Sequence, residues 1–141
     1  MKGSYIIVVH LPVNSTIRVG ALGDLDFVKG YYLYIGSAMG NKGSTTLEHR
    51  IKRHLSNPKN KTIFWHIDYL LANKKCVITC IYLIPSLSRM ECLFSGEISK
   101  NSDNFVKNFG SSDCGCISHL YYFQEYWDLT QIGKPPYKSN Q

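Results

Sequence analysis

The sequence has few acidic residues and no long apolar run. Its 141 residues include 10 Asp and Glu against 16 Lys and Arg, which gives a net charge of +6. No apolar run approaches the ~20 residues that a membrane-spanning helix needs, so we expect no membrane partner. The excess of positive charge favours an anionic partner, with nucleic acid first, although a modest excess could serve solubility alone.

The sequence also lacks internal repeats, low-complexity linkers and a segment typical of a secretion signal. Its length and 44% hydrophobic content suit one globular domain. We expect that domain over residues 1–125, with 126–141 as a C-terminal tail. The five cysteines are an odd number, which predicts free thiols in a reducing compartment, the cytoplasm. Cys76, Cys80 and Cys92 stand among apolar neighbours and are expected in the core.

Apolar patterning and turn residues predict the strands. Residues 16–27 are expected to form a hairpin, because two short arms flank glycines that suit a turn. The other predicted strands are 4–11, 31–36, 76–85 and 120–123.

Three helices are predicted between these strands. Thr45 and Glu48 form a T-x-x-E capping box at the start of the first helix, whose apolar residues then recur at helical spacing. A second helix is expected at 62–73, and a third begins at Ser88. Strands come in clusters instead of alternating singly with helices. The sequence therefore predicts an α+β fold, with helices packed on a small, mostly antiparallel (mixed) sheet and an extra N-terminal hairpin.

Basic residues concentrate in residues 49–61, on the first helix and the loop after it. On a helical wheel, Arg50 lies about 100° and His54 about 60° from the centre of the apolar stripe, on the same side. We expect both at the rim of a groove between helix and sheet, and the alternative is that they snorkel over the core. Arg53 lies farther round the wheel and is expected in solvent.

Such a groove would combine groups that act on phosphodiesters. A guanidinium is a planar fork suited to phosphate, and a histidine one turn on can position a water or move a proton. A strand tyrosine such as Tyr34 could orient the nucleophile, and packing in the core is its alternative role. A carboxylate could hold a divalent cation against phosphate oxygens.

Two short motifs carry a resemblance to a known superfamily. The residues GSY at 3–5 and YIG at 34–36 resemble the paired signatures of the GIY-YIG nuclease superfamily. Its helix pattern of leucine, arginine and histidine matches Leu47, Arg50 and His54, and its catalytic glutamate falls on Glu91.

The resemblance is closer to an uncharacterised GIY-YIG-related family of archaea and some bacteria. Its members are sometimes fused to an endonuclease III-like DNA repair domain. The segments HIDYLL (66–71), GSSDC (110–114) and SHLYYF (118–123) are similar to its signatures. The match runs from about residue 2 to 125.

The resemblance implies a metal-dependent endonuclease that hydrolyses phosphodiester bonds in DNA, acting in repair. Tyr5 and Tyr34 would border the attacking water, Arg50 would clamp the phosphate and His54 would assist. Glu91 would hold Mg²⁺ or Mn²⁺. The expected partners are DNA or RNA and an endonuclease III-like repair enzyme. The residues expected to contact nucleic acid are Lys42, Arg50 and Arg53.

Departures from the superfamily pattern favour a second hypothesis. The first motif is GSY instead of GIY, and the hairpin at 16–27 lengthens the gap between the motifs. The asparagine that usually follows the glutamate has no clear counterpart, although Asn104 has about the right spacing. These features favour a catalytically inactive nucleic-acid-binding module, or an interaction domain beside a repair enzyme.

Glu91 has an alternative role too. With Ser88 it forms an S-x-x-E capping box, in which it would satisfy a backbone N–H at the helix start. Glu97 is then the rival carboxylate.

A turn-rich loop offers further candidate site residues. Its motif C-x-C-x₂-H supplies three metal-ligating side chains, whereas a zinc site needs four. We therefore do not expect zinc, and the alternative is a tight loop whose polar side chains bond to the backbone. The additional candidates are His66, Asp68, Asp113, Cys114, Cys116 and His119.

Overall fold

The computed structural model describes residues 1–57, 62–111, 114–127 and 129–131. The strands are β1 (Gly3–Leu11), β2 (Ser15–Arg18), β3 (Asp24–Phe27), β4 (Gly30–Ala38), β5 (Val77–Pro85), β6 (Asn104–Phe105) and β7 (Leu120–Phe123). The α-helices are α1 (Leu47–His54), α2 (His66–Leu71) and α3 (Glu91–Ser99). Short 3₁₀ turns are η1 (Gly20–Leu22), η2 (Gly43–Thr45) and η4 (Leu129–Gln131). None of these described helices is long and apolar enough to cross a bilayer.

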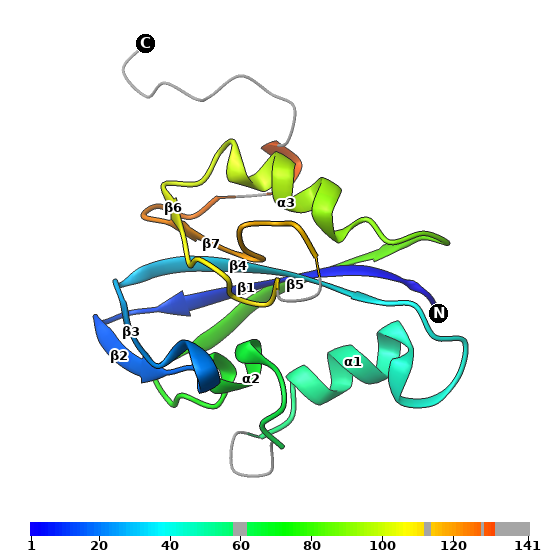
Figure 1. The fold of residues 1–141 in the computed structure, drawn as a ribbon, viewed down its shortest axis with the longest axis horizontal. Helices are drawn as coiled ribbons and strands as arrows, with labels where there is room; N and C mark the ends of the chain where they lie inside the picture. Colours follow the sequence, from blue (N-terminus) through cyan, green and yellow to red (C-terminus); the bar gives the residue numbers. More distant parts are fainter. Residues whose placement is uncertain (58–61, 112–113, 128, 132–141) are drawn as a thin grey trace.

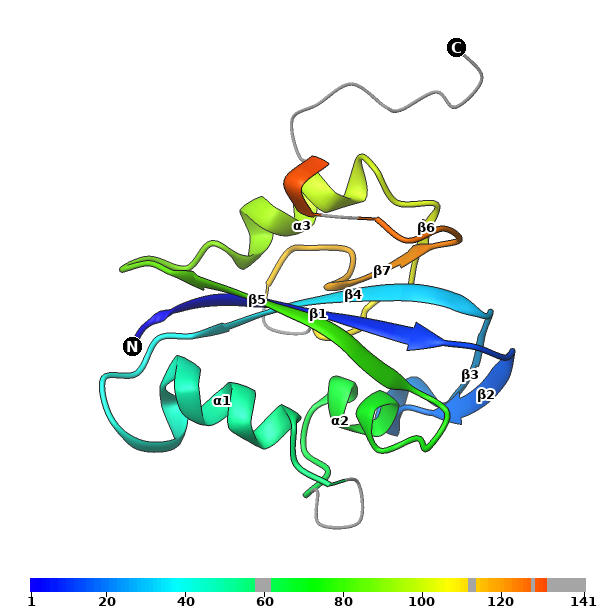
Figure 2. The same ribbon diagram turned by 180° about the vertical axis from the view of Figure 1, so that it is seen from behind.

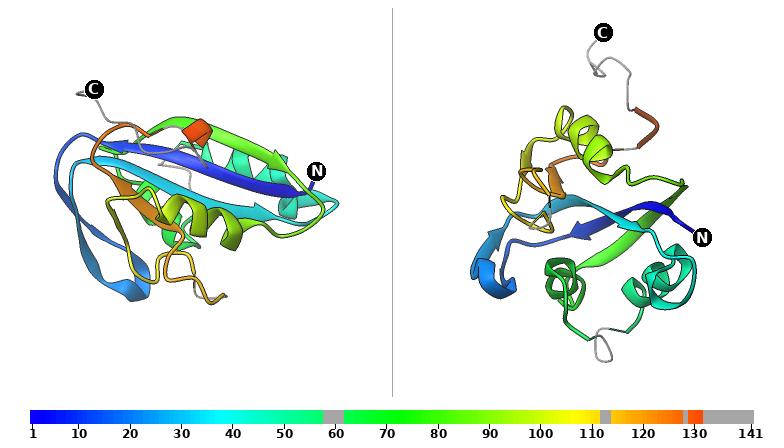
Figure 3. Two further views of the ribbon diagram at one scale, coloured as in Figure 1. Left: turned by 90° about the horizontal axis from the view of Figure 1, so that it is seen from above. Right: turned by 45° about the vertical axis from the view of Figure 1, so that its right-hand side comes forward.

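The main sheet has the strand order β5-β1-β4-β7-β6, and each neighbouring pair is antiparallel (Figure 1). The strands β2 and β3 form a separate antiparallel hairpin. Helices pack on both faces of the main sheet, with α1 and α2 on one side and α3 on the other (Figures 1, 2 and 3). The predicted α+β fold with an N-terminal hairpin is therefore confirmed.

The central strand β1 contributes to both layers of the core. Successive side chains of a strand point to opposite faces of the sheet. Ile7 and its alternate neighbours pack with Leu47 of α1 and Leu70 of α2, whereas Ile6 and Val8 pack with Ile98 of α3. This double burial explains why the strand reads as a continuous apolar run.

The helix starts differ from the predictions in detail. Helix α1 is capped by Thr46, whose side chain accepts a hydrogen bond from the backbone N–H of His49. Thr45 belongs instead to the 3₁₀ turn η2 and donates to the carbonyl of Lys42, so the predicted capping box on Thr45 is wrong by one residue. Helix α2 is shorter than predicted.

Helix α3 does not begin with the predicted capping box. Its N-cap is Met90, which makes no side-chain capping bond. The Ser88 hydroxyl lies 3.8 Å from the sulfur of Met90, in the turn that leads out of β5. The Ser88–Glu91 capping box is therefore wrong, and the Glu91 side chain is available for another role.

The other differences from the predictions concern one cysteine and the C-terminal end of the packed chain. Cys76 and Cys80 pack against the two core clusters as predicted, but Cys92 is exposed, so that prediction was wrong. Trp127 is buried and stacks on Phe123, so the packed chain extends past the predicted end at residue 125. Residues 132–141 of the predicted tail lie outside the described residues.

Candidate functional site

A cleft of about 460 Å³ lies beside the second half of β4. Strand β7 pairs with Tyr31–Tyr34 of β4, and the Ile35 N–H still donates to the His119 carbonyl just before β7. Beyond Ile35, no described strand pairs with this edge of β4. Side chains from both faces of the sheet can meet at such an edge. The polar residues that line the cleft include Tyr5, Tyr34, Ser37, Arg50, Arg89 and Glu91. The structure therefore brings together four of the five predicted catalytic residues, from β1, β4, α1 and α3.

Gly36 lets the Tyr5 ring lie across β4. The two residues are directly opposite in the β1–β4 register. A Cβ atom at position 36 would come within 2.5 Å of the Tyr5 hydroxyl oxygen, closer than side chains can approach. The glycine of the YIG motif is therefore a steric requirement for placing Tyr5 in the cleft.

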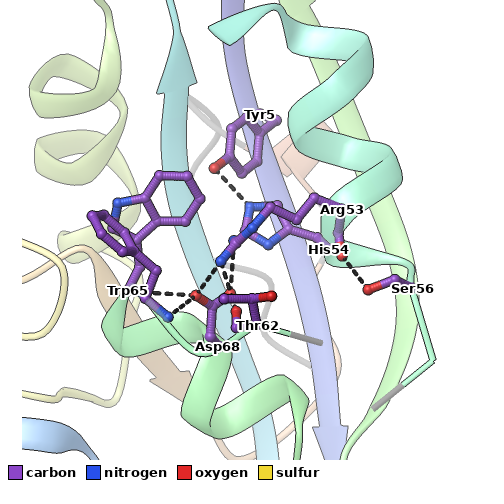
Figure 4. Close-up of polar contacts among 8 residues, drawn as sticks. Tyr5, Arg53, His54, Ser56, Thr62, Trp65 and Asp68 are labelled. Carbon is purple, nitrogen blue, oxygen red and sulfur yellow. Dashed lines mark hydrogen bonds and ion pairs between the residues drawn. The ribbon is translucent and has the colours of Figure 1, made fainter. Parts of the chain in front are cut away.

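His54 lies behind Tyr5 instead of at the rim. Its Nε2 is 2.9 Å from the Tyr5 hydroxyl, and its side chain is buried (Figure 4). His54 does not line the cleft. The predicted rim position is wrong because Tyr5 supplies a polar partner inside the core, which makes burial of the imidazole favourable. The Tyr5 hydroxyl therefore links His54 to the cleft.

The two cleft tyrosines are neutral at physiological pH. Burial raises the pKa of Tyr5 to about 12, although the nearby Arg50 charge acts in the opposite direction. Burial also raises the pKa of Tyr34 well above its usual value. The Tyr34 hydroxyl makes no hydrogen bond with another described residue. Each phenol can therefore donate and accept hydrogen bonds in the cleft, but neither is a phenolate base.

The raised pKa of Tyr5 predicts a loss of stability at alkaline pH. Because the folded pKa of about 12 exceeds the ordinary value of 10.0, the stabilisation is complete below pH 10 and is lost as pH rises toward 12. We expect Tyr5 to account for about 2–3 kcal/mol of that loss. Urea unfolding of the wild type and Tyr5→Phe between pH 8 and about 12 measures it. An equal loss in both proteins would contradict the assignment to Tyr5.

Arg50 is held at the cleft, as predicted. Its NH1 group is 3.4 Å from the Ser37 carbonyl, and its guanidinium lies 4.5 Å from the centre of the Trp65 ring. Its Nε is buried and has no hydrogen-bond partner among the described residues. The Ser37 carbonyl and the Trp65 ring thus position Arg50 at the cleft, and a guanidinium held there suits an anion. Trp65, an aromatic residue just before α2, was missed by the sequence reasoning.

Arg53 is not a solvated outer-face residue. Its guanidinium forms two hydrogen bonds to the Asp68 carboxylate, at 2.9 and 2.7 Å, and a third to the carbonyl of Thr62 (Figure 4). Asp68 is fully buried and also accepts from the backbone N–H groups of Phe64 and Trp65. The expected solvation of Arg53 is wrong, because its planar fork matches a buried carboxylate. The pair joins α1 to α2.

Glu91 is in the first turn of α3, with its side chain 17% exposed toward the cleft. Its Oε1 is 3.5 Å from NH1 of Arg89, which also donates to the Ser37 hydroxyl at 3.1 Å. Arg89 is a second cation in the cleft that sequence reasoning missed, since its position after a strand and before a helix carries no periodic signal. Glu97 pairs with Lys100 and does not line the cleft.

The remaining predicted residues have other surroundings. His66 accepts a hydrogen bond from the backbone N–H of Gly110, which ties α2 to the later loop. Lys42 is exposed and does not line the cleft, and its contact with nucleic acid stays a prediction. Asn104 is exposed on β6, outside the cleft. Asp113 lies outside the described residues.

A group of four side chains, three of which line the cleft, could bind a metal. Cys92, Cys114, Cys116 and His119 place their ligand atoms within 4.8 Å of one another. Sequence reasoning identified the three that share a loop and missed Cys92, which comes from α3. The only sequence feature that could have pointed to Cys92 as a site residue is its position next to Glu91.

Comparison with protein families gives a match over most of the chain. The family model described as "Domain of unknown function DUF123" matches residues 4–138. No curated protein and no solved structure matches the chain. Because the family match spans nearly the whole sequence, the protein belongs to the DUF123 family.

Proposed function

We propose that this protein is a GIY-YIG-related, metal-dependent endonuclease that hydrolyses phosphodiester bonds in DNA. The observation that supports this proposal is the convergence of Tyr5, Tyr34, Arg50 and Glu91 on one cleft. They come from four separate elements: the β1–β4 register puts Tyr5 and Tyr34 on the same face of the sheet, whereas Arg50 and Glu91 come from helices on opposite faces (Figure 1). Gly36 adds support, since its missing side chain makes room for Tyr5.

The two arginines would bind the scissile phosphate. Arg50 and Arg89 both contact Ser37, one at its carbonyl and the other at its hydroxyl. A phosphate placed beside Ser37 would meet both guanidinium groups. In a cleft partly shielded from water, such fixed cations stabilise the charge that develops on the phosphate oxygens.

Tyr5 and His54 would move a proton away from the attacking water. With His54 in the tautomer whose Nε2 lacks a proton, the Tyr5 hydroxyl donates to that nitrogen and its oxygen can accept from a water. As the water attacks phosphorus, its proton would pass to the Tyr5 oxygen while the Tyr5 proton passes to His54. This relay keeps Tyr5 neutral throughout, which suits its raised pKa.

Glu91 would hold Mg²⁺ or Mn²⁺. Magnesium is commonly bound through one or two carboxylates together with substrate phosphates and waters, and a single cleft carboxylate fits that mode. Among the described residues that line the cleft, Glu91 is the one carboxylate. When bound, the ion would act as a Lewis acid on the phosphate. When substrate binds, Arg89 would give up its contact with Glu91 and contact the phosphate instead.

A cleavage assay tests the proposal. Branched and linear DNA are incubated with the protein, with and without Mg²⁺ or Mn²⁺, and products are counted in single turnover. We expect cleavage only with the metal, and Arg50→Ala should lower the rate by about 10²–10³-fold. Arg18→Ala, which removes an exposed arginine from the hairpin, is the matched control and should cut like the wild type.

The second candidate function is a nucleic-acid-binding module without catalysis. The observation that favours it is the position of Asn104, the proposed counterpart of the superfamily asparagine, outside the cleft. Wild-type protein that binds DNA or RNA in a salt-dependent way, yet cuts nothing across metals and substrates, would support this function and contradict the first. The cytoplasmic location and the endonuclease III-like repair partner remain part of the proposal and rest on the resemblance.

A further inference from the structure

The strongest site outside the proposed catalytic residues is the thiol–histidine cluster, defined as Cys92, Cys114, Cys116 and His119. Cys92 is the second residue of α3, and the other three belong to the loop before β7. The Cys114 Sγ is 3.4 Å from His119 Nε2, and the Sγ atoms of Cys92 and Cys116 are 2.6 Å apart. Two segments separated in sequence thus present four ligand atoms to one point.

We propose that the thiol–histidine cluster holds a structural zinc ion. Zinc takes thiolate sulfur at about 2.3 Å and imidazole nitrogen at about 2.0–2.1 Å, in tetrahedral sites with four ligands. Ligand atoms at those lengths lie roughly 3.3–3.8 Å from one another. The four atoms of the cluster, all within 4.8 Å, need only small side-chain adjustments to reach that geometry. Three thiolates select a soft metal and disfavour Mg²⁺.

Four protein ligands leave no open position on a tetrahedral zinc ion, so its role is structural. The contacts that α3 makes with the core, through Phe94 and Ile98, lie beyond its first three residues. Within the helix only Ser95 and Ile98 are buried, whereas Leu93 is 58% exposed. A zinc ion bound through Cys92 would anchor this end of the helix to the loop before β7.

The same anchor would position the neighbouring carboxylate. Glu91 directly precedes Cys92, and Cys92, Cys114 and His119 also contribute to the cleft wall. Fixing the first turn of α3 therefore fixes where Glu91 can point. The zinc site itself does not depend on the endonuclease proposal, because its test needs no DNA.

A disulfide between Cys92 and Cys116 is the competing arrangement. These two sulfur atoms are the closest pair in the cluster, and a disulfide would remove two of the three thiolates. The two arrangements differ in metal content and in the number of reactive thiols, so the same purified protein distinguishes them.

The first measurement uses the full chain purified without chelator. We expect about one zinc per chain by elemental analysis, release of that zinc when a mercurial blocks the thiols, and five reactive thiols after unfolding without reductant. After zinc removal, Co²⁺ should give the visible absorption of a tetrahedral thiolate site. Iron in place of zinc, three reactive thiols, or no zinc after reconstitution would each overturn the proposal.

Variants then test the ligand set. Cys92→Ser and His119→Ala should each lower zinc affinity by 10-fold or more, as expected for the loss of one ligand. Cys76→Ser makes the same thiol-to-hydroxyl change in a half-buried cysteine outside the cluster, and it should retain about one zinc. Where Cys92→Ser does not fold, Cys92→His restores a ligand and should recover zinc. Full zinc affinity in folded Cys92→Ser would overturn the four-ligand site.

Discussion

Replacing Glu91 with glutamine is expected to lower metal-dependent DNA cleavage by about 10²–10³-fold, with little change in Tm. Glutamine has the same shape but lacks the negative charge that a hard cation prefers. Stability should be kept because Glu91 forms no capping box with Ser88, and its 3.5 Å contact with the exposed Arg89 is a weak ion pair. Single-turnover cleavage in Mg²⁺ and a thermal melt measure both effects.

The matched control is Glu97→Gln in the same helix. Glu97 pairs with Lys100 and does not line the cleft, so this variant should cut DNA at the wild-type rate. Cleavage by Glu91→Gln at the wild-type rate would show that the metal is held elsewhere. A large fall in Tm for Glu91→Gln would instead assign the carboxylate a structural role.

Replacing Asp68 with alanine is expected to destabilise the protein by about 3–5 kcal/mol, the usual cost of breaking a buried ion pair. The change removes both hydrogen bonds to Arg53 and leaves two backbone N–H groups without their acceptor. Arg53 keeps partial access to water, with 28% of its side chain exposed, which places the cost toward the lower end. Urea unfolding at pH 7 gives the free energy.

Glu97→Ala is the control, because it removes a carboxylate from an exposed pair and should cost less than about 1 kcal/mol.

Acid titration gives a second check of the Asp68–Arg53 ion pair. Burial tends to raise the pKa of Asp68, but the hydrogen bonds from Arg53 and the backbone outweigh it and lower the pKa below 3.8. The stabilisation is therefore present above that value and lost as pH falls through the folded pKa. Equal losses of stability in Asp68→Ala and Glu97→Ala would contradict the buried ion pair.

The sequence by itself determined most of the strands and helices, including the elements that supply the candidate site, whereas β6 and the starts of the helices were not predicted. The apolar pattern that predicts a strand reflects which side chains are buried on each face of the sheet. That pattern lies within a few consecutive residues, so the sequence alone contains it. The double burial of β1 is visible in its apolar run, and the YIG glycine lies where Tyr5 crosses β4. Arg50 and Glu91 could be named because the motif pattern assigns them without reference to their neighbours.

Only the tertiary structure decided which polar groups find partners. His54 is buried because Tyr5, 49 residues earlier, offers a hydrogen bond, and Arg53 is engaged because α2 brings Asp68 beneath it. Cys92 meets the loop cysteines because α3 begins where that loop passes. A helical wheel gives the direction of each side chain from the helix axis, but it contains no information on the segments that pack against the helix. The free-energy cost of burying a polar side chain depends on whether the fold supplies a hydrogen-bond partner for it. Whether such a side chain is buried or exposed therefore follows from the tertiary structure.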